Sequence, residues 1–70
     1  MMQKKYRIIA CNRITGQTEG FVKSVSYKNQ TFKLTTNANE AKTYISDDKI
    51  QGEIDDLTLF SRGNYVFLIN

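Results

Sequence analysis

Apolar and polar residues alternate along the first half of the chain. The segment 6–12, YRIIACN, is rich in β-branched and aromatic residues and alternates as a strand does. The alternation predicts two faces, one with Tyr6, Ile8 and Ala10 and the other with Arg7, Ile9 and Cys11. The Thr15-Gly16 pair that follows is a turn signal, because glycine can adopt a positive φ. We therefore expect a hairpin from this strand to the next.

Two further alternating runs, FVKSVSY (21–27) and TFKLTT (31–36), predict a second hairpin. With Asn29 and Gln30 as its two loop residues, Lys28 pairs with Thr31, and Val25 with Leu34. This register gives a core side with Phe21, Val25, Tyr27, Phe32 and Leu34, and a solvated side with Val22, Ser24, Ser26, Lys28, Thr31, Lys33 and Thr35. Lys23 falls on the core side, where its stem can pack while its amine reaches water.

After the third strand the hydrophobic spacing changes from two residues to three or four. Asn37, with Glu40 three positions later, is an N-cap signal that predicts a short helix. The inward residues of this helix are expected to be Ala41, Tyr44 and Ile45. The change of period is thus explained by a cap and requires no ligand.

A second N-cap signal is Ser46, followed by two acids in the first helical turn. It predicts an amphipathic helix of about three turns, with Ile50, Ile54 and Leu57 facing inward. Gly52 falls on its polar side, where glycine costs about 1 kcal/mol relative to alanine.

The C-terminal run NYVFLI (64–69) is apolar on both faces, which is typical of a central strand covered by helices. LTLF (57–60) is an optional short strand before it. The sequence thus predicts a single small α+β domain over residues 1–70, in the order β-β-β-α-α-(β)-β. Its antiparallel sheet has four or five strands, with one face covered by a short and a longer helix.

Composition narrows the function classes. The chain has no histidine, which removes the usual general base at neutral pH and the commonest transition-metal ligand. Its single cysteine, Cys11, excludes an intrachain disulfide and a cysteine metal cluster, and we interpret it as a small packed hydrophobe rather than a nucleophile. The acids Asp47, Asp48, Glu53, Asp55 and Asp56 do not have EF-hand spacing and are interpreted as a solvated helix face, with a partner-facing patch as the alternative for Asp55 and Asp56. We expect no enzyme, no metal and no cofactor.

Length and hydropathy suggest where the protein works. A chain of 70 residues buries on folding only about 60% of the surface that it exposes when unfolded. The sequence is therefore compatible with either a monomer or a homodimer. No apolar run approaches the roughly 20 residues of a membrane span, and the N-terminal run is too short for a signal peptide. We expect a cytoplasmic protein that does not bind membranes.

Charge is divided between the two halves of the chain. Residues 1–42 hold eight Lys/Arg against two acids, a net +6, and residues 43–70 hold two against five, a net −3. The solvated sheet face carries Lys28 and Lys33, with Arg7 nearby, as candidate partner or phosphate contacts. Sheets that bind single-stranded nucleic acid also stack its bases on exposed aromatic side chains. The predicted register instead turns the aromatic side chains of this sheet toward the core. A protein partner is therefore expected, with nucleic-acid binding through a basic sheet face as the alternative.

The run FKLTTNANEAKTYIS resembles a pattern in small uncharacterised proteins of phages and mobile elements from low-GC Gram-positive bacteria. In these proteins a strand ends in threonine and a capped helix carries Ala-Lys-x-aromatic, here Ala41, Lys42, Thr43 and Tyr44. The resemblance covers about residues 30–57. It implies an accessory or host-interaction role and no catalytic residues.

Overall fold

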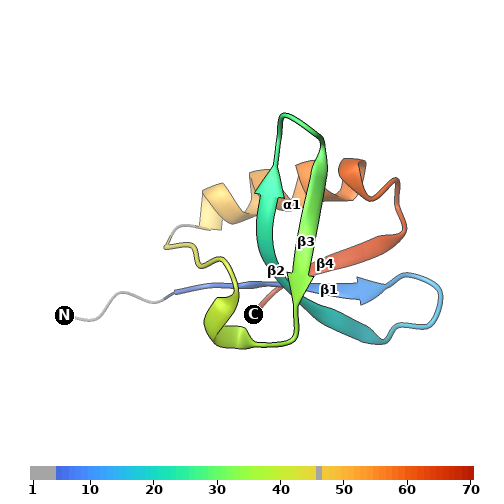
Figure 1. The fold of residues 1–70 in the computed structure, drawn as a ribbon, viewed down its shortest axis with the longest axis horizontal. Coiled ribbons are helices and arrows are strands. Elements are labelled where there is room, and N and C mark those ends of the chain that lie inside the picture. Colours follow the sequence, from blue (N-terminus) through green and yellow to red (C-terminus); the bar gives the residue numbers. More distant parts are fainter. Residues whose placement is uncertain (1–4, 46) are drawn as a thin grey trace.

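The alternating first half of the chain forms an antiparallel meander in the computed structural model, which describes residues 5–45 and 47–70. The elements are β1 (Ile8–Asn12), β2 (Thr18–Ser26), β3 (Thr31–Thr35), the 3-10 turn η1 (Ala38–Glu40), α1 (Asp47–Phe60) and β4 (Tyr65–Ile69) (Figure 1). The strands make one four-stranded sheet in the order β3-β2-β1-β4. Both β1 and β2 pair antiparallel with each of their neighbours, which confirms the α+β class.

The first hairpin turns where the sequence predicts. The side chain of Asn12 accepts hydrogen bonds from the backbone N–H groups of Ile14 and Thr15, at 2.8 and 3.0 Å. Gly16 follows with a φ of 76°, and its N–H donates to the Asn12 carbonyl. An Asx side chain and a left-handed glycine together close the turn.

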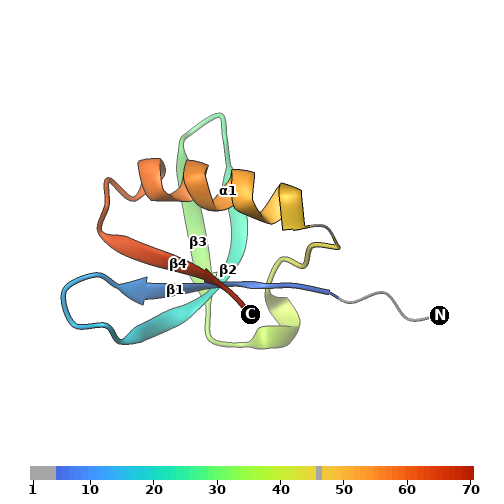
Figure 2. The ribbon, with the colours of Figure 1, turned by 180° about the vertical axis from the view of Figure 1, so that it is seen from behind.

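The sheet is strongly curled, and α1 lies on its inner side (Figures 1 and 2). β3 and β4 form the two opposite edges, yet the Phe32 ring of β3 contacts the rings of Tyr65 and Phe67 of β4, with centroids 5.8 and 5.5 Å apart. These edge-to-face contacts bring the two ends of the sheet together beneath the helix.

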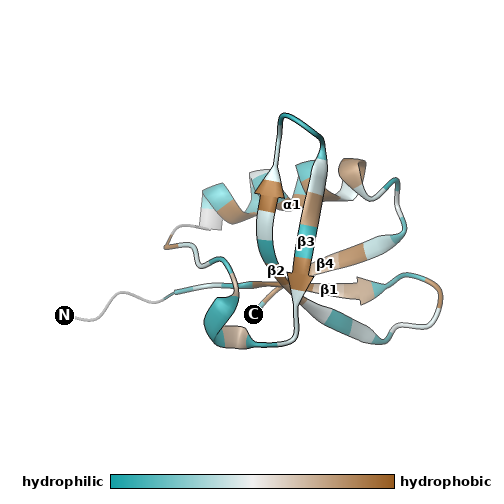
Figure 3. Cartoon of the chain, in the orientation of Figure 1, coloured by the Kyte–Doolittle hydropathy of each residue, from teal (hydrophilic) through white to brown (hydrophobic). Residues whose placement is uncertain are grey.

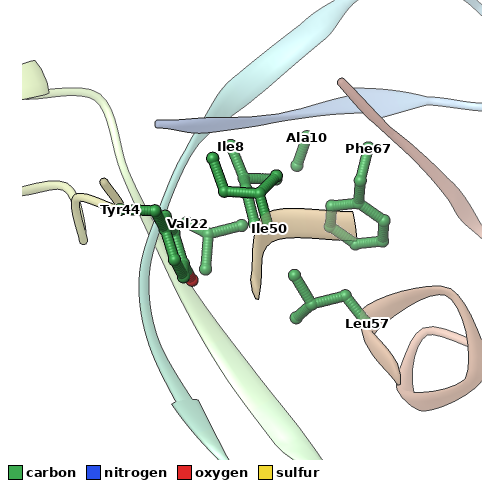
Figure 4. Close-up of a cluster of buried hydrophobic side chains, with 7 residues drawn as sticks. All are labelled: Ile8, Ala10, Val22, Tyr44, Ile50, Leu57 and Phe67. Carbon is green, nitrogen blue, oxygen red and sulfur yellow. The ribbon is translucent and has the colours of Figure 1, made fainter. Parts of the chain in front are cut away.

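The core lies between the inner side of the sheet and α1 (Figure 4). Its buried members are Ile8, Ala10, Val22, Tyr44, Ile50, Leu57 and Phe67. Ile50 and Leu57 are fully buried and Ile54 packs against them, as the helical spacing predicts. Hydrophobic and hydrophilic residues accordingly alternate along the α1 ribbon (Figure 3).

The predicted register of the second hairpin is wrong. Ser26, rather than Lys28, pairs with Thr31, and Val25 pairs with Phe32, so that the connection is the four-residue turn 27–30. A two-residue turn of type I′ needs a positive φ at both central residues. Of its two expected members, Asn29 and Gln30, only Gln30 adopts one, at 55°.

A β-bulge in β2 overturns the predicted faces near its centre. Ser24 pairs with Lys33 and Val22 with Leu34, which leaves Lys23 as an extra residue. Before the bulge the alternation is reversed. Val22, expected on the solvated side, is therefore 0% exposed in the core, while Phe21, expected in the core, turns to the other face of the sheet.

The remaining parts of the predicted core side also change. Tyr27 belongs to the turn and is half exposed, with its ring edge-on to Phe60. Lys23 is exposed and pairs with Glu40 at 3.4 Å instead of packing its stem inward.

The short helix is only the single turn η1. Asn37 caps it as predicted, accepting from the N–H of Asn39 and donating its amide to Glu40. The chain then becomes extended, because its backbone finds partners far away in the sequence: Tyr44 exchanges two hydrogen bonds with Tyr6. Ala41 and Tyr44 are still buried, but Ile45 is 59% exposed, against expectation.

The second half contains one longer helix and one edge strand in its described part. α1 extends through residue 60, so that residues 57–60 are helical and form no strand. The second N-cap residue, Ser46, lies outside the described residues. β4 is an edge strand rather than a central one. No helix among the described residues is long and apolar enough to cross a membrane.

Two glycines should respond in opposite directions to the same substitution. Gly20 has a φ of 150°, and a Cβ there would lie 2.7 Å from the Thr35 carbonyl oxygen. We expect Gly20→Ala to lower the free energy of unfolding by at least about 1 to 3 kcal/mol. At Gly52 a Cβ would meet nothing within 4 Å, so Gly52→Ala should raise it by about 1 kcal/mol. Urea unfolding of both variants tests this, and destabilisation by Gly52→Ala would contradict the placement of that residue.

Candidate functional site: the open face of the sheet

The face of the sheet turned away from α1 carries a row of apolar side chains across three strands. Ile9 of β1 lies between Phe21 of β2 and Leu68 of β4 in the register of the sheet. Directly opposed residues point to the same side, with Cβ atoms about 4.5 to 5.5 Å apart. The three side chains therefore form one continuous row.

A second row lies two residues farther along β1, where Cys11 pairs with Val66. We call the five residues of both rows the open-face stripe: Ile9, Cys11, Phe21, Val66 and Leu68. Leu68 is 51% and Val66 43% exposed, and the other three are partly buried. The bulge at Lys23 contributes directly, because it turns Phe21 outward.

The three predicted contact residues lie around the stripe rather than in one place. Lys33 is exposed on β3, on the same face, opposite Ser24. Lys28 lies in the turn 27–30 at the end of that hairpin. Arg7 lies just before β1 and is partly buried, and its Nε donates to the Ala38 carbonyl at 3.0 Å. The structure thus brings Lys33 and Lys28 near one end of the sheet, whereas β2 separates them from Arg7.

Aromatic side chains are concentrated on the other side. Phe32, Tyr65 and Phe67 contact one another beneath α1, and Tyr27 packs on Phe60. Of the aromatic residues in the described strands, Phe21 is the one whose register places it on the open face. In the described strands, this face therefore offers one aromatic side chain for base stacking rather than several.

A partly buried ion pair lies between α1 and the extended segment that follows η1. Lys42 Nζ is 2.8 Å from Glu53 Oε1, and the Glu53 side chain is only 10% exposed. The Lys42 ammonium also lies 5.2 Å from the centre of the Tyr44 ring. This ion pair attaches the segment to α1, so it has a structural role, and it accounts for one of the five predicted surface acids.

Burial raises the pKa of Tyr44 above its usual range, and the nearby Glu53 carboxylate adds to the effect. The Tyr44 hydroxyl is buried without a hydrogen-bond partner of normal geometry among the described residues, since the hydrogen bond of Glu53 goes to Lys42. Burial also raises the pKa of Tyr27, with smaller contributions from Glu53 and Asp56.

Metal-ligating side chains do not cluster in the described part of the chain. No three His, Cys, Asp or Glu residues gather there as a metal site would require. The Cys11 sulfur lies 3.9 Å from the Thr18 hydroxyl, a weak contact. Comparison of the chain with protein-family models, curated proteins and solved structures found no match.

The stripe was not predicted from the sequence, although a signal for it exists. NYVFLI is apolar on both faces of a strand. Val66 and Leu68 fall on one face, and Phe67 between them falls on the other. From the sequence the run is interpreted as a central strand that the helices cover. With helix α1 on one side only, the same pattern leaves an exposed apolar face.

Alkaline pH should destabilise the fold through Tyr44. The folded chain keeps this proton at pH values where the unfolded chain loses it, so the free energy of unfolding falls as pH rises above the ordinary tyrosine value of 10.0. One such group contributes at most about 1.4 kcal/mol per pH unit. Tyr44→Phe should be as stable as the wild type near neutrality, because the hydroxyl has no partner to lose, and should weaken less above pH 10. Urea unfolding at pH 8 and at alkaline pH measures both effects, and identical pH profiles would contradict this assignment.

Proposed function

We propose that this protein is a non-enzymatic binding module that recognises another protein through the open-face stripe. The observation that carries the proposal is the half-exposed Leu68 and Val66 beside Ile9 and Phe21. Contiguous apolar patches on small soluble domains typically mark interaction sites. The stripe crosses β2, β1 and β4, so a partner would contact rigid strands rather than loops.

The charges around the stripe fit a protein interface. Such interfaces combine an apolar centre with a polar rim. Lys33 lies at the β3 edge of the same face, and Arg7 lies two residues before Ile9. In this position basic residues steer association more than they determine affinity. Arg7, Lys28 and Lys33 are therefore proposed as rim residues.

Nucleic-acid binding is the second candidate, favoured by the outward position of Phe21 beside Lys33. It is the weaker candidate, because one aromatic side chain offers one stacking platform, and Arg7 is already bonded to Ala38. An accessory or host-interaction role in phages or mobile elements, implied by the resemblance of FKLTTNANEAKTYIS, agrees with a module that binds a protein.

Replacement of Leu68 by lysine tests the proposal, with Leu59→Lys as the matched control. Both residues are exposed leucines, but Leu59, 74% exposed, lies on α1 and outside the stripe. Each tagged variant is used to capture proteins from an extract of the native host, with and without nuclease treatment. We expect the wild type and Leu59→Lys to retain the same proteins, and Leu68→Lys to lose them at least tenfold, with thermal unfolding showing that all three are folded.

The same variants separate the two candidates. A lysine at position 68 adds a positive charge to the face that carries Phe21, so a nucleic-acid-binding face would bind oligonucleotides more tightly in Leu68→Lys than in the wild type. Equal capture of proteins by all three chains would contradict the role of the stripe. Tighter oligonucleotide binding by Leu68→Lys, together with capture that nuclease abolishes, would favour the alternative.

A further inference from the structure

Two hollows adjoin at the end of α1 where the chain turns into β4. The first, about 290 Å³, is lined by Arg13, Ile14, Arg62, Gly63 and Asn64. The second, about 240 Å³, is lined by Thr58 of α1 and by residues 65–67 of β4, together with Arg13 and Gly63. Because they share Arg13 and Gly63, the hollows form one groove, which begins at two arginines and continues between α1 and β4.

The two arginines have no acidic partner among the described residues. Arg13 Nη1 donates to the Gly63 carbonyl at 3.3 Å, which leaves most of its donors unused. No ion pair of the described chain includes either guanidinium. Among the residues that the structure describes, no acid lines either hollow, so none of them compensates the positive charge here. A carboxylate is the natural bidentate partner of such a group.

Arg62 is held in an unusual backbone conformation. α1 ends in a Schellman motif, in which the N–H of Gly63 donates to the Thr58 carbonyl and the N–H of Arg62 to that of Leu59. The residue at the left-handed position of this motif is usually glycine. Here it is Arg62, with a φ of 57°. Local strain of this kind persists mainly where the side chain has a use.

The groove also borders unpaired backbone. Arg7 and Asn70 exchange two hydrogen bonds at the start of the β1–β4 ladder. In an antiparallel pair, every second residue of a strand directs its N–H and C=O groups away from the partner strand. Counted from Asn70, these residues of β4 are Tyr65, Phe67 and Ile69, whose backbone groups point to the outer edge of β4. An extended segment can pair with such an edge by strand addition.

A second copy of this chain fits the edge poorly. The curl of the sheet brings Phe32 of β3 against Tyr65 and Phe67, and α1 covers the same side. The sheet of a second copy carries its own helix, which would collide with α1. A single extended segment is narrow enough to lie beside β4.

We propose that this groove binds an extended protein segment that bears a carboxylate, with the carboxylate on Arg13 and Arg62 and the backbone of the segment along β4. The exposed Ile14 at the rim offers an apolar contact to a neighbouring side chain of the segment. This inference depends on the proposed function in one respect, namely that the partner is a protein. The groove and the stripe share Val66, so variants at residues that belong to one surface each, Arg62 for the groove and Leu68 for the stripe, test them separately.

The experiment titrates the ¹⁵N-labelled chain with an end-blocked peptide of alternating valine and threonine that carries one terminal glutamate. A peptide with glutamine in its place is the matched ligand. We expect the glutamate peptide to shift the backbone amides of residues 62–67 and to bind at least fivefold more tightly than the glutamine peptide. The preference for glutamate depends on Arg13 and Arg62, and the capture of host proteins depends on Leu68, so failure of the groove and failure of the stripe are distinguishable.

Arg62→Gly separates binding from folding. It removes the guanidinium and also the left-handed non-glycine residue, so its melting temperature should not fall, while the preference for glutamate should disappear. Lys49→Gln removes one positive charge from an exposed position near the other end of α1 and should keep the preference. Equal binding of the two peptides, retention of the glutamate preference in Arg62→Gly, or dimerisation of the free chain through β4 in sedimentation would each overturn the proposal.

Discussion

The extra residue in β2 determines the inside and the outside of this protein. At Lys23 the pairing with β3 shifts by one residue, so that Phe21 and Val22 lie on the faces opposite to those of an unbroken alternation. A second irregularity in β2, at Glu19, then shifts the pairing with β1, and Thr18 faces Cys11. Val22 consequently joins Ile8 and Ile50 in the core, and Phe21 joins the apolar row on the opposite face. The same bulge increases the local twist, which fits the way β2 leaves β1 after Phe21 to follow β3. The placement of Val22 in the core and of Phe21 on the candidate binding face both depend on this bulge.

The segment after η1 occupies the space that β2 vacates. Tyr44 pairs with Tyr6, beyond the last β1–β2 pair, and the Lys42 N–H donates to the Val22 carbonyl next to the bulge. The ion pair between Lys42 and Glu53 then ties this segment to α1. A sheet of four short strands therefore acquires a covered end without a further full strand. This arrangement compensates for the small core that a chain of 70 residues can form.

The sequence predicts the local features well and the distant pairings poorly. The faces of β1, the first turn, the Asn37 cap and the inward residues of α1 follow from local spacing, and all are found. The capped helix fails because Tyr44 bonds to Tyr6, a partner that no local pattern indicates. One feature of the sequence agrees with the bulge: Lys23 falls on the apolar side of the predicted strand. An unbroken strand explains this position by a lysine whose aliphatic stem packs inward. The groove has no sequence signal, since Arg13 and Arg62 meet only through the fold.

The central claim is that the bulge turns Val22 inward and leaves an apolar row on the open face. Solvent paramagnetic relaxation of methyl groups by a neutral soluble gadolinium chelate measures this directly in the intact chain. The account predicts strong enhancement for Leu68 and Val66 and almost none for Val22, which is fully buried. Strong enhancement at Val22 would mean that β2 keeps an unbroken alternation, which would contradict the fold described. Protection of Leu68 would mean that the open face is covered, which would contradict the binding face derived from the fold.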